Sequence, residues 1–223
     1  MTNSYKISDL LLHRDNQVLA LNKPATVPAQ PDKTGDKSIL DLGEIYAKSS
    51  LFPINRIDRP ASGIILLAKT NRAVQSLNQQ FQERSIIKTY LAVVGQLPAE
   101  KEGTLVHFLQ KNPRTKKAQV VAEGTKNAKR SELNYRCLAS IERYHLLEVQ
   151  PITGRYHQIR AQLAAIGSPL KGDVKYGFRR GNADRSIHLH AWKLAFTHPV
   201  NGERIELCAP LPTENVWQAF DWS

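Results

Sequence analysis

Residues 55–69 read N-R-I-D-R-P-A-S-G-I-I-L-L-A-K, with one carboxylate, Asp58, between Arg56 and Arg59 and directly before an aliphatic run. That run, residues 64–68, has the length and composition of a β-strand that is buried on both faces. The charges at its start have two explanations that the local sequence leaves open. They form an ion pair at the edge of the core, or the acid is held there for chemistry.

The peptide that leads into this strand is predicted to be stiff. Pro60 fixes its own φ angle and favours an extended conformation for Arg59, and Gly63 permits a tight turn. This stiff peptide would hold the Asp58 carboxylate at the edge of the sheet. A neighbouring guanidinium would keep the carboxylate ionised, and Arg160, on the polar face of a later predicted helix, is the candidate partner.

The rest of the chain intersperses strands and helices without strict alternation. Strands are predicted at residues 18–21, 86–94, 132–140, 144–150, 189–196 and 205–208, and helices at 38–48, 72–83 and 153–167. Ser38 and Thr153 are the expected N-caps, and Gly167 is expected to end the last helix. The pattern predicts an α+β fold with a mixed, mostly antiparallel sheet and flanking helices.

Length and composition are those of a globular protein. The 223 residues, 41% of them hydrophobic and 23% charged, are enough to build a core without disulfides, and we expect one domain over residues 1–223. The two cysteines suggest a reducing compartment, and the start of the chain lacks the pattern of a signal peptide. We therefore expect a cytoplasmic protein without a membrane partner, since the longest aliphatic run is far too short to span a bilayer.

The charge balance indicates a polyanionic partner. The chain has 31 Lys and Arg against 20 Asp and Glu, which gives a formal net charge of +11. No amphipathic basic helix accompanies this excess, so nucleic acid is the favoured partner. The alternative is a basic protein that is merely soluble.

The basic excess is concentrated between residues 111 and 130, where Glu123 is the one acid. Turn residues on both sides of an apolar run predict a hairpin with a basic loop at each end. We expect four of its side chains to contact an RNA backbone: Lys111, Arg114, Lys116 and Lys117. A solvated, mobile loop is the alternative.

Several familiar kinds of site are absent or weak. The sequence contains no dinucleotide-binding or phosphate-binding glycine motif and no nucleophile elbow. His188 and His190 are two residues apart, but further metal ligands are lacking, so we expect local hydrogen bonds and no metal or cofactor. Asp173, which follows Gly172 in a predicted turn, is interpreted as structural.

Five segments, in order, resemble the RluA-type RNA pseudouridine synthases over nearly the whole chain, from about residue 15 to about residue 210. The motif around Asp58 resembles that family's R-L-D-x-x-[TS]-S-G. The segments are L21-N-K-P24, R56-I-D-R-P-A-S-G63, K88-T-Y-L-A-V-V-G95, G154-R-Y-H-Q-I-R160 with its continuation to Gly177, and L189-H-A-W-K-L-A-F-T-H-P-V200. The chain departs from the family pattern at Asn55, Ala61 and Tyr156, which bears on the choice of RNA more than on the chemistry.

The resemblance implies an isomerase of the intramolecular transferase class that converts a uridine of ribosomal or transfer RNA to pseudouridine without a cofactor. It implies that Asp58 is catalytic and is paired with Arg160, that Tyr90 stacks on the uracil, and that Arg56 enters the space left by the flipped base. It further implies a catalytic domain of two sublobes around a central cleft, acting as a monomer on an RNA stem-loop. A preceding S4-type RNA-binding domain is not expected.

Two other functions remain as alternatives. A glycoside or nucleoside hydrolase also acts at C1′, but it usually needs two flanking carboxylates. In this sequence Asp58 is the one acid with both an expected charged partner and a stiff peptide around it. A non-catalytic RNA-binding module is the other, although a carboxylate among phosphates would not help such a module to bind.

Overall fold

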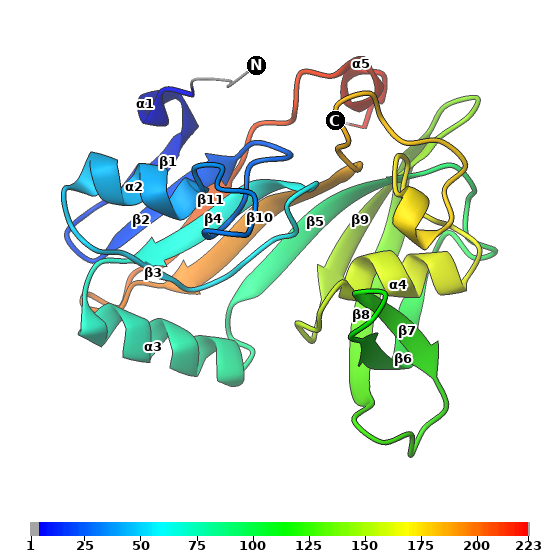
Figure 1. The fold of residues 1–223 in the computed structure, drawn as a ribbon, viewed down its shortest axis with the longest axis horizontal. Helices are drawn as coiled ribbons and strands as arrows, with labels where there is room; N and C mark the ends of the chain where they lie inside the picture. Colours follow the sequence, from blue (N-terminus) through cyan, green and yellow to red (C-terminus); the bar gives the residue numbers. More distant parts are fainter. Residues whose placement is uncertain (1–4, 223) are drawn as a thin grey trace. The chain divides into compact units, whose positions relative to one another are not determined.

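The computed structural model describes residues 5–222 and divides the chain into two compact units, each described by itself (Figure 1). The first unit joins the chain up to Lys88 to residues Ala191–Pro212. The second joins Thr89–His190 to the segment that begins at Thr213. The chain passes from one unit to the other at three points: within strand β5, within strand β10 and after Pro212.

The first unit has a sheet in the order β1-β2-β4-β10, with β3 added to β4 and β11 to β10. The ladders β1–β2, β2–β4, β3–β4 and β10–β11 are antiparallel. The elements are α1 (Ile7–Leu10), β1 (Leu11–Arg14), β2 (Val18–Lys23), α2 (Ile39–Ala47), β3 (Phe52–Pro53), β4 (Ser62–Ala68), α3 (Asn71–Gln82), β10 (Leu189–Thr197) and β11 (Arg204–Cys208).

Helices α2 and α3 cover opposite faces of this sheet. Leu77 of α3 packs with Leu66 of β4 and Phe196 of β10 in one cluster. On the other face, Gly43 of α2 lies against Leu67. All seven residues of β4 are buried, which confirms the prediction of a strand enclosed on both sides and explains its uninterrupted apolar sequence.

Both long helices of this unit begin at a side-chain cap. Ser38 and Asp41 form a capping box on α2, in which each side chain accepts a hydrogen bond from the backbone N–H of the other. Thr70 caps α3 by accepting from the N–H of Ala73. The predicted start of the first helix at Ser38 is confirmed.

The second unit has an antiparallel sheet in the order β5-β9-β8-β6-β7. Its elements are β5 (Ile87–Val94), β6 (Glu102–Asn112), β7 (Lys117–Val121), β8 (Lys129–Ser140), β9 (His145–Pro151), α4 (Gln158–Ala165), η1 (Val174–Tyr176) and α5 (Asn215–Gln218). The predicted basic hairpin corresponds to β6, β7 and the start of β8. The α+β class with mostly antiparallel strands is confirmed.

Helix α4 begins four residues later than predicted, after His157, so Thr153 as its N-cap is wrong. The Thr153 hydroxyl lies instead 2.7 Å from Oε1 of Gln158 and 2.9 Å from the N–H of Glu132, which ties the loop before the helix to β8. The helix starts after His157, which has a φ of 51° and interrupts the helical path. Its predicted end is confirmed, because Gly167 follows with a φ of 81°.

The predicted polar face of this helix is also wrong, because Arg160 is buried. Ala161 packs against Leu109 of β6 and Ala118 of β7, so the helix is covered by the hairpin. Within residues 5–222, none of the helices has the length and apolar character needed to cross a membrane.

Candidate active site

Asp58 lies in the loop between β3 and β4, half-buried, and its carbonyl accepts a hydrogen bond from the N–H of Ala61 at 3.0 Å. This bond closes a turn directly before the first residues of β4. Gly63 then has a φ of 113°, and a Cβ atom there would lie 2.3 Å from the carbonyl oxygen of Ala191. The turn and the glycine together fix where the Asp58 peptide stands relative to strand β10.

The same loop is held from inside the unit by Lys23, the last residue of β2. Its ammonium donates to the carbonyl of Ala61 at 2.6 Å, to that of Arg59 at 3.1 Å, and to those of Pro24 and Val27 at 2.9 and 2.8 Å. Lys23 is fully buried, so these four carbonyls replace the water that an ammonium would otherwise bind. Two residues of the Asp58 turn, Arg59 and Ala61, are thereby tied to β2.

Burial lowers the pKa of Lys23 to about 7, with the nearby charge of Asp58 acting to raise it and that of Arg59 to lower it. A lysine that the sequence did not single out as functional therefore lies close enough to Asp58 for that carboxylate to act on its pKa.

Arg56 is exposed, whereas Arg59 is partly buried and bound by the loop before α2. The two arginines that flank Asp58 thus have different surroundings. The exposed side chain of Arg56 is accessible to a ligand, as its expected role at the flipped base requires. Asn55 spans the same loop, since its amide donates to the carbonyl of Ile64 and accepts from the N–H of Leu66.

The second unit contains Tyr90 and Arg160. Tyr90 is half-buried on β5, where it pairs with Val149 of β9. The Arg160 guanidinium forms a bidentate ion pair with Asp173, from Nε to Oδ2 at 2.7 Å and from Nη2 to Oδ1 at 2.8 Å. Both members of this pair are buried, which makes it costly to break.

Asp173, which the sequence indicated to be structural, is thus bound by the side chain of Arg160. The remaining nitrogen of the guanidinium, Nη1, lies 3.3 Å from Nε2 of His157. The expected pairing of Arg160 with Asp58 stays a prediction, because Asp58 belongs to the first unit and Arg160 to the second.

A chain of rings extends from Arg160 to the basic hairpin. Arg160 lies over the ring of Tyr176 at 4.9 Å, and the hydroxyl of Tyr176 is 2.8 Å from Nδ1 of His157. His157 in turn stacks on Tyr156, with ring centroids 3.8 Å apart. Lys111 lies 4.6 Å above the Tyr156 ring. Tyr156, at which the sequence departs from the family pattern, is thus the ring that meets the hairpin.

Two further hydrogen bonds tie the hairpin to these rings. The hydroxyl of Tyr156 donates to the carbonyl of Lys116 at 3.2 Å, and the N–H of Ala118 donates to the hydroxyl of Tyr176 at 2.7 Å. Lys111, Arg114 and Lys116 are exposed, and Lys117 is half-buried. The hairpin therefore presents charged side chains from a backbone that is anchored on the loop before α4 and on η1.

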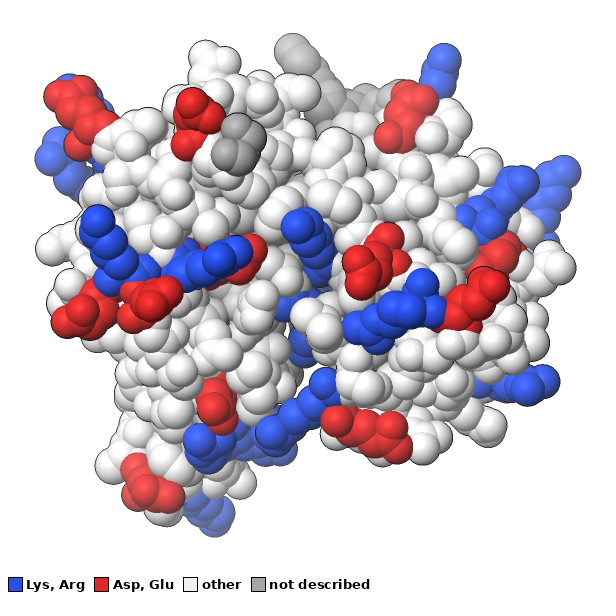
Figure 2. Space-filling model, turned by 180° about the vertical axis from the view of Figure 1, so that it is seen from behind, with Lys and Arg blue, Asp and Glu red and all other residues white. Residues whose placement is uncertain are grey.

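Acidic and basic side chains alternate over the face that Figure 2 shows, rather than forming one uninterrupted basic field. Individual clusters such as the hairpin, and not the net charge alone, therefore define where a polyanion can be held.

Of the predicted histidine pair, His188 is held by hydrogen bonds, one of them to Glu214, which lies 26 residues away in the sequence. His188 is buried, with Nε2 at 2.6 Å from Glu214 and Nδ1 at 3.1 Å from Asn182, and it stacks on Trp217. His190 is buried beside the same indole. In the part of the chain from residue 5 to residue 222, no three His, Cys, Asp or Glu side chains are grouped as metal ligands.

Comparison with known proteins gives a consistent result. A family model described as RNA pseudouridylate synthase matches residues 17–165. The protein named "Uncharacterized RNA pseudouridine synthase YlyB" from Bacillus subtilis is 33% identical over 92% of this chain and 69% of its own length. "Ribosomal large subunit pseudouridine synthase C" from Vibrio parahaemolyticus is 32% identical over 94% and 68%. "tRNA pseudouridine synthase C" from Haemophilus ducreyi is 32% identical over 95% and 96%.

Solved structures agree with these relatives. The structure titled "Human RNA Pseudouridylate Synthase Domain Containing 1" superposes with a TM-score of 0.76 at 26% identity, and the match covers 94% of this chain and 86% of that chain.

Proposed function

The chain belongs to the RNA pseudouridylate synthase family, and on this basis we propose that it isomerises one uridine of a ribosomal or transfer RNA to pseudouridine with Asp58 as the catalytic carboxylate. The observation that carries the assignment of Asp58 is its position in a turn held by the buried ammonium of Lys23. A half-buried carboxylate on a fixed peptide is suited to act at one defined point of a bound nucleotide.

The chemical step needs an ionised carboxylate at neutral pH. The bond from C1′ to N1 breaks, the uracil turns, a bond from C1′ to C5 forms, and the proton on C5 is lost to N1 in the net reaction. Substrate and product therefore have the same mass. Asp58 assists the step at C1′ or at the ring, from a turn that Lys23 holds through two of its carbonyls.

The target uridine must leave its base stack before the enzyme can reach it. The free-energy cost of this step is a few kcal/mol and is smallest in loops and bulges. Arg56 is assigned to the vacated space because its guanidinium is exposed and planar, so that it can stack on neighbouring bases. Tyr90 is assigned to the face of the extruded uracil, and the β6–β7 hairpin to the phosphates. Two of the relatives are named as synthases of ribosomal large subunit RNA and of transfer RNA, and the substrate of this chain is proposed to be of one of these kinds.

The test is the conversion of uridine to pseudouridine in RNA from cells that lack the gene, with the wild-type protein and with Asp58→Asn. The wild type is expected to form pseudouridine at a defined position with no change in RNA mass. Asp58→Asn is expected to bind the same RNA within about twofold but to form no product above background. Asp9→Asn, which removes an exposed carboxylate of α1, is the matched control and should remain active.

Two results would refute the assignment. Turnover by Asp58→Asn would exclude Asp58 as the catalytic group. A loss of uracil mass from the RNA would identify a hydrolase instead, because isomerisation releases nothing.

A further inference from the structure

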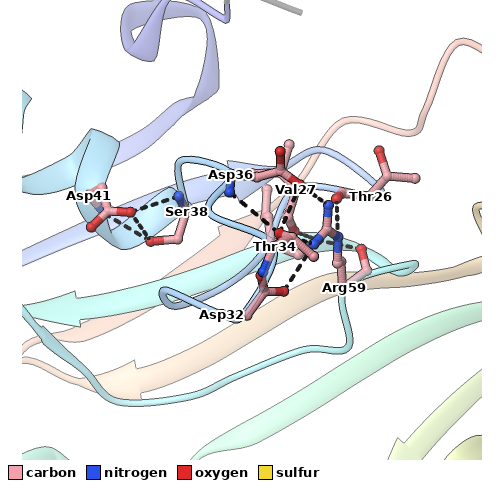
Figure 3. A network of polar contacts seen from close by, with 9 residues as sticks. Thr26, Val27, Asp32, Thr34, Asp36, Ser38, Asp41 and Arg59 are labelled. Carbon is pink, nitrogen blue, oxygen red and sulfur yellow. Dashed lines mark hydrogen bonds and ion pairs between the residues drawn. The ribbon is translucent and has the colours of Figure 1, made fainter. Parts of the chain in front are cut away.

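Arg59 is bound by the loop before α2 through three side chains (Figure 3). Its Nη1 donates to Oδ2 of Asp32 at 3.0 Å and to the hydroxyl of Thr34 at 2.7 Å, and its Nη2 forms an ion pair with Asp36. We call Arg59, Asp32, Thr34 and Asp36 the Arg59 clamp. The planar fork of arginine, which presents donors in fixed directions, suits three acceptors around one guanidinium.

The clamp is continuous with the peptide that carries Asp58. Nε of Arg59 donates to the carbonyl of Thr26 at 2.9 Å, and the N–H of Thr26 donates back to the carbonyl of Arg59 at 2.8 Å. Lys23 also donates to that carbonyl. The residue directly after Asp58 is therefore held both by its backbone and by its side chain.

The loop that supplies the acids is itself anchored. At its far end, the N–H of Ile39 donates to the carbonyl of Pro28 at 2.8 Å, and Ser38 and Asp41 form the capping box that starts α2. Figure 3 shows the capping box and the Arg59 clamp along the same loop. Arg59 thus connects the Asp58 peptide to a helix on a separate part of the unit.

We propose that Arg59 is a positioning residue for the isomerisation, and that with Asp32 and Asp36 it fixes the peptide on which Asp58 stands. This inference rests on the proposed function. The motif R-L-D-x-x-[TS]-S-G leaves the residue at the position of Arg59 unspecified. A role for Arg59 in binding RNA phosphate is disfavoured, because two carboxylates around one guanidinium leave a net negative charge that repels phosphate.

The two roles predict opposite effects when the acids are removed. If Arg59 positions Asp58, then Arg59→Ala and the double variant Asp32→Asn with Asp36→Asn each lower kcat about tenfold at saturating RNA, with KM little changed. Combining all three substitutions should cost no more than either alone, because both remove the same interaction. Arg59→Lys, which keeps the charge but not the fork, should lie between Arg59→Ala and the wild type.

If Arg59 instead held RNA, Arg59→Ala would raise KM and leave kcat, while the double acid variant would lower KM by freeing the guanidinium and removing negative charge. That pattern would overturn the proposal. Arg72→Ala is the control for the loss of one positive charge, since Arg72 is exposed on α3 and should leave both constants unchanged.

A measurement without RNA separates this inference from the proposed function. Hydrogen exchange of two amides reports on the clamp: Thr26, which donates to Arg59, and Ala61, which donates to Asp58. Both should exchange faster in Arg59→Ala and in the double acid variant, and unchanged exchange would refute the clamp. If the wild type made no pseudouridine, the proposed function would fail, and the exchange rates would still decide whether the clamp fixes this peptide.

Discussion

At the scale of single residues, Lys23 combines complete burial with a positive charge, and its four carbonyl acceptors make that combination possible. Replacing it with Met, which is similar in length but apolar, would leave those carbonyls buried without their donor. We expect Lys23→Met to lower the free energy of unfolding by about 3 kcal/mol, as measured by urea denaturation. Lys101→Met, at an exposed lysine, is the control and should change it by no more than about 0.5 kcal/mol.

The pH dependence of this difference has a defined sign. The pKa of Lys23 is about 7 in the folded chain and near its ordinary value of 10.5 when unfolded. Between these values the unfolded chain binds the proton that the folded chain releases, so Lys23 makes the wild type more stable as pH rises from 7 towards 10.5. The wild type should therefore gain stability relative to Lys23→Met between pH 7 and pH 9. A difference that shrank over this range would contradict the lowered pKa.

At the scale of elements, the start of β4 depends on how closely two strands approach. A Cβ at Gly63 would lie 2.3 Å from the carbonyl oxygen of Ala191 in β10, and the glycine also has a φ of 113°. Gly63→Ala should lower the free energy of unfolding by about 2–3 kcal/mol and should reduce pseudouridine formation, since the Asp58 turn precedes this residue.

Gly202→Ala separates the two causes in that prediction. Gly202 also has a positive φ, 74°, but a Cβ atom there would meet nothing within 4 Å beyond its chain neighbours, so only the conformational cost remains. Thermal denaturation of both variants is the measurement. Equal losses of stability would show that the contact with Ala191 does not matter.

Sequence patterns predicted some of these elements correctly and others incorrectly. The aliphatic run of β4 predicted a doubly buried strand because hydrophobic residues without alternation leave no polar face. The start of α4 was missed because Thr153 is a common capping residue, yet here its hydroxyl bonds Gln158 and β8 instead. Local preference for a cap was overridden by a contact between residues that are 21 apart in the sequence.

At the scale of the whole molecule, the net charge of +11 predicts RNA binding that weakens with salt. We expect the double variant Arg114→Gln with Lys116→Gln to bind RNA more weakly and to reduce the slope of log affinity against log salt by about 1–2. Both side chains are exposed on the hairpin, while its backbone contacts to Tyr156 and Tyr176 are retained.

The control for that experiment removes the same charge elsewhere. Lys48→Gln with Arg72→Gln takes two positive charges from the first unit, at the end of α2 and the start of α3. If both double variants changed the slope of log affinity against log salt equally, RNA binding would depend on the net charge and not on the hairpin. Filter binding or fluorescence anisotropy from about 50 to about 200 mM salt gives the slopes.

By itself, the sequence determined the class of fold, the family and the candidate carboxylate, because these are written in local patterns: an aliphatic run, a proline and glycine around Asp58, and ordered motifs. Only the tertiary structure revealed that Lys23 holds the Asp58 turn across 38 residues, that Arg160 pairs with Asp173, and that Arg59 is clamped by acids more than 20 residues away. The linear sequence does not show which group a charged side chain will pair with. Folding selects one by burying the charge where few acceptors remain within reach.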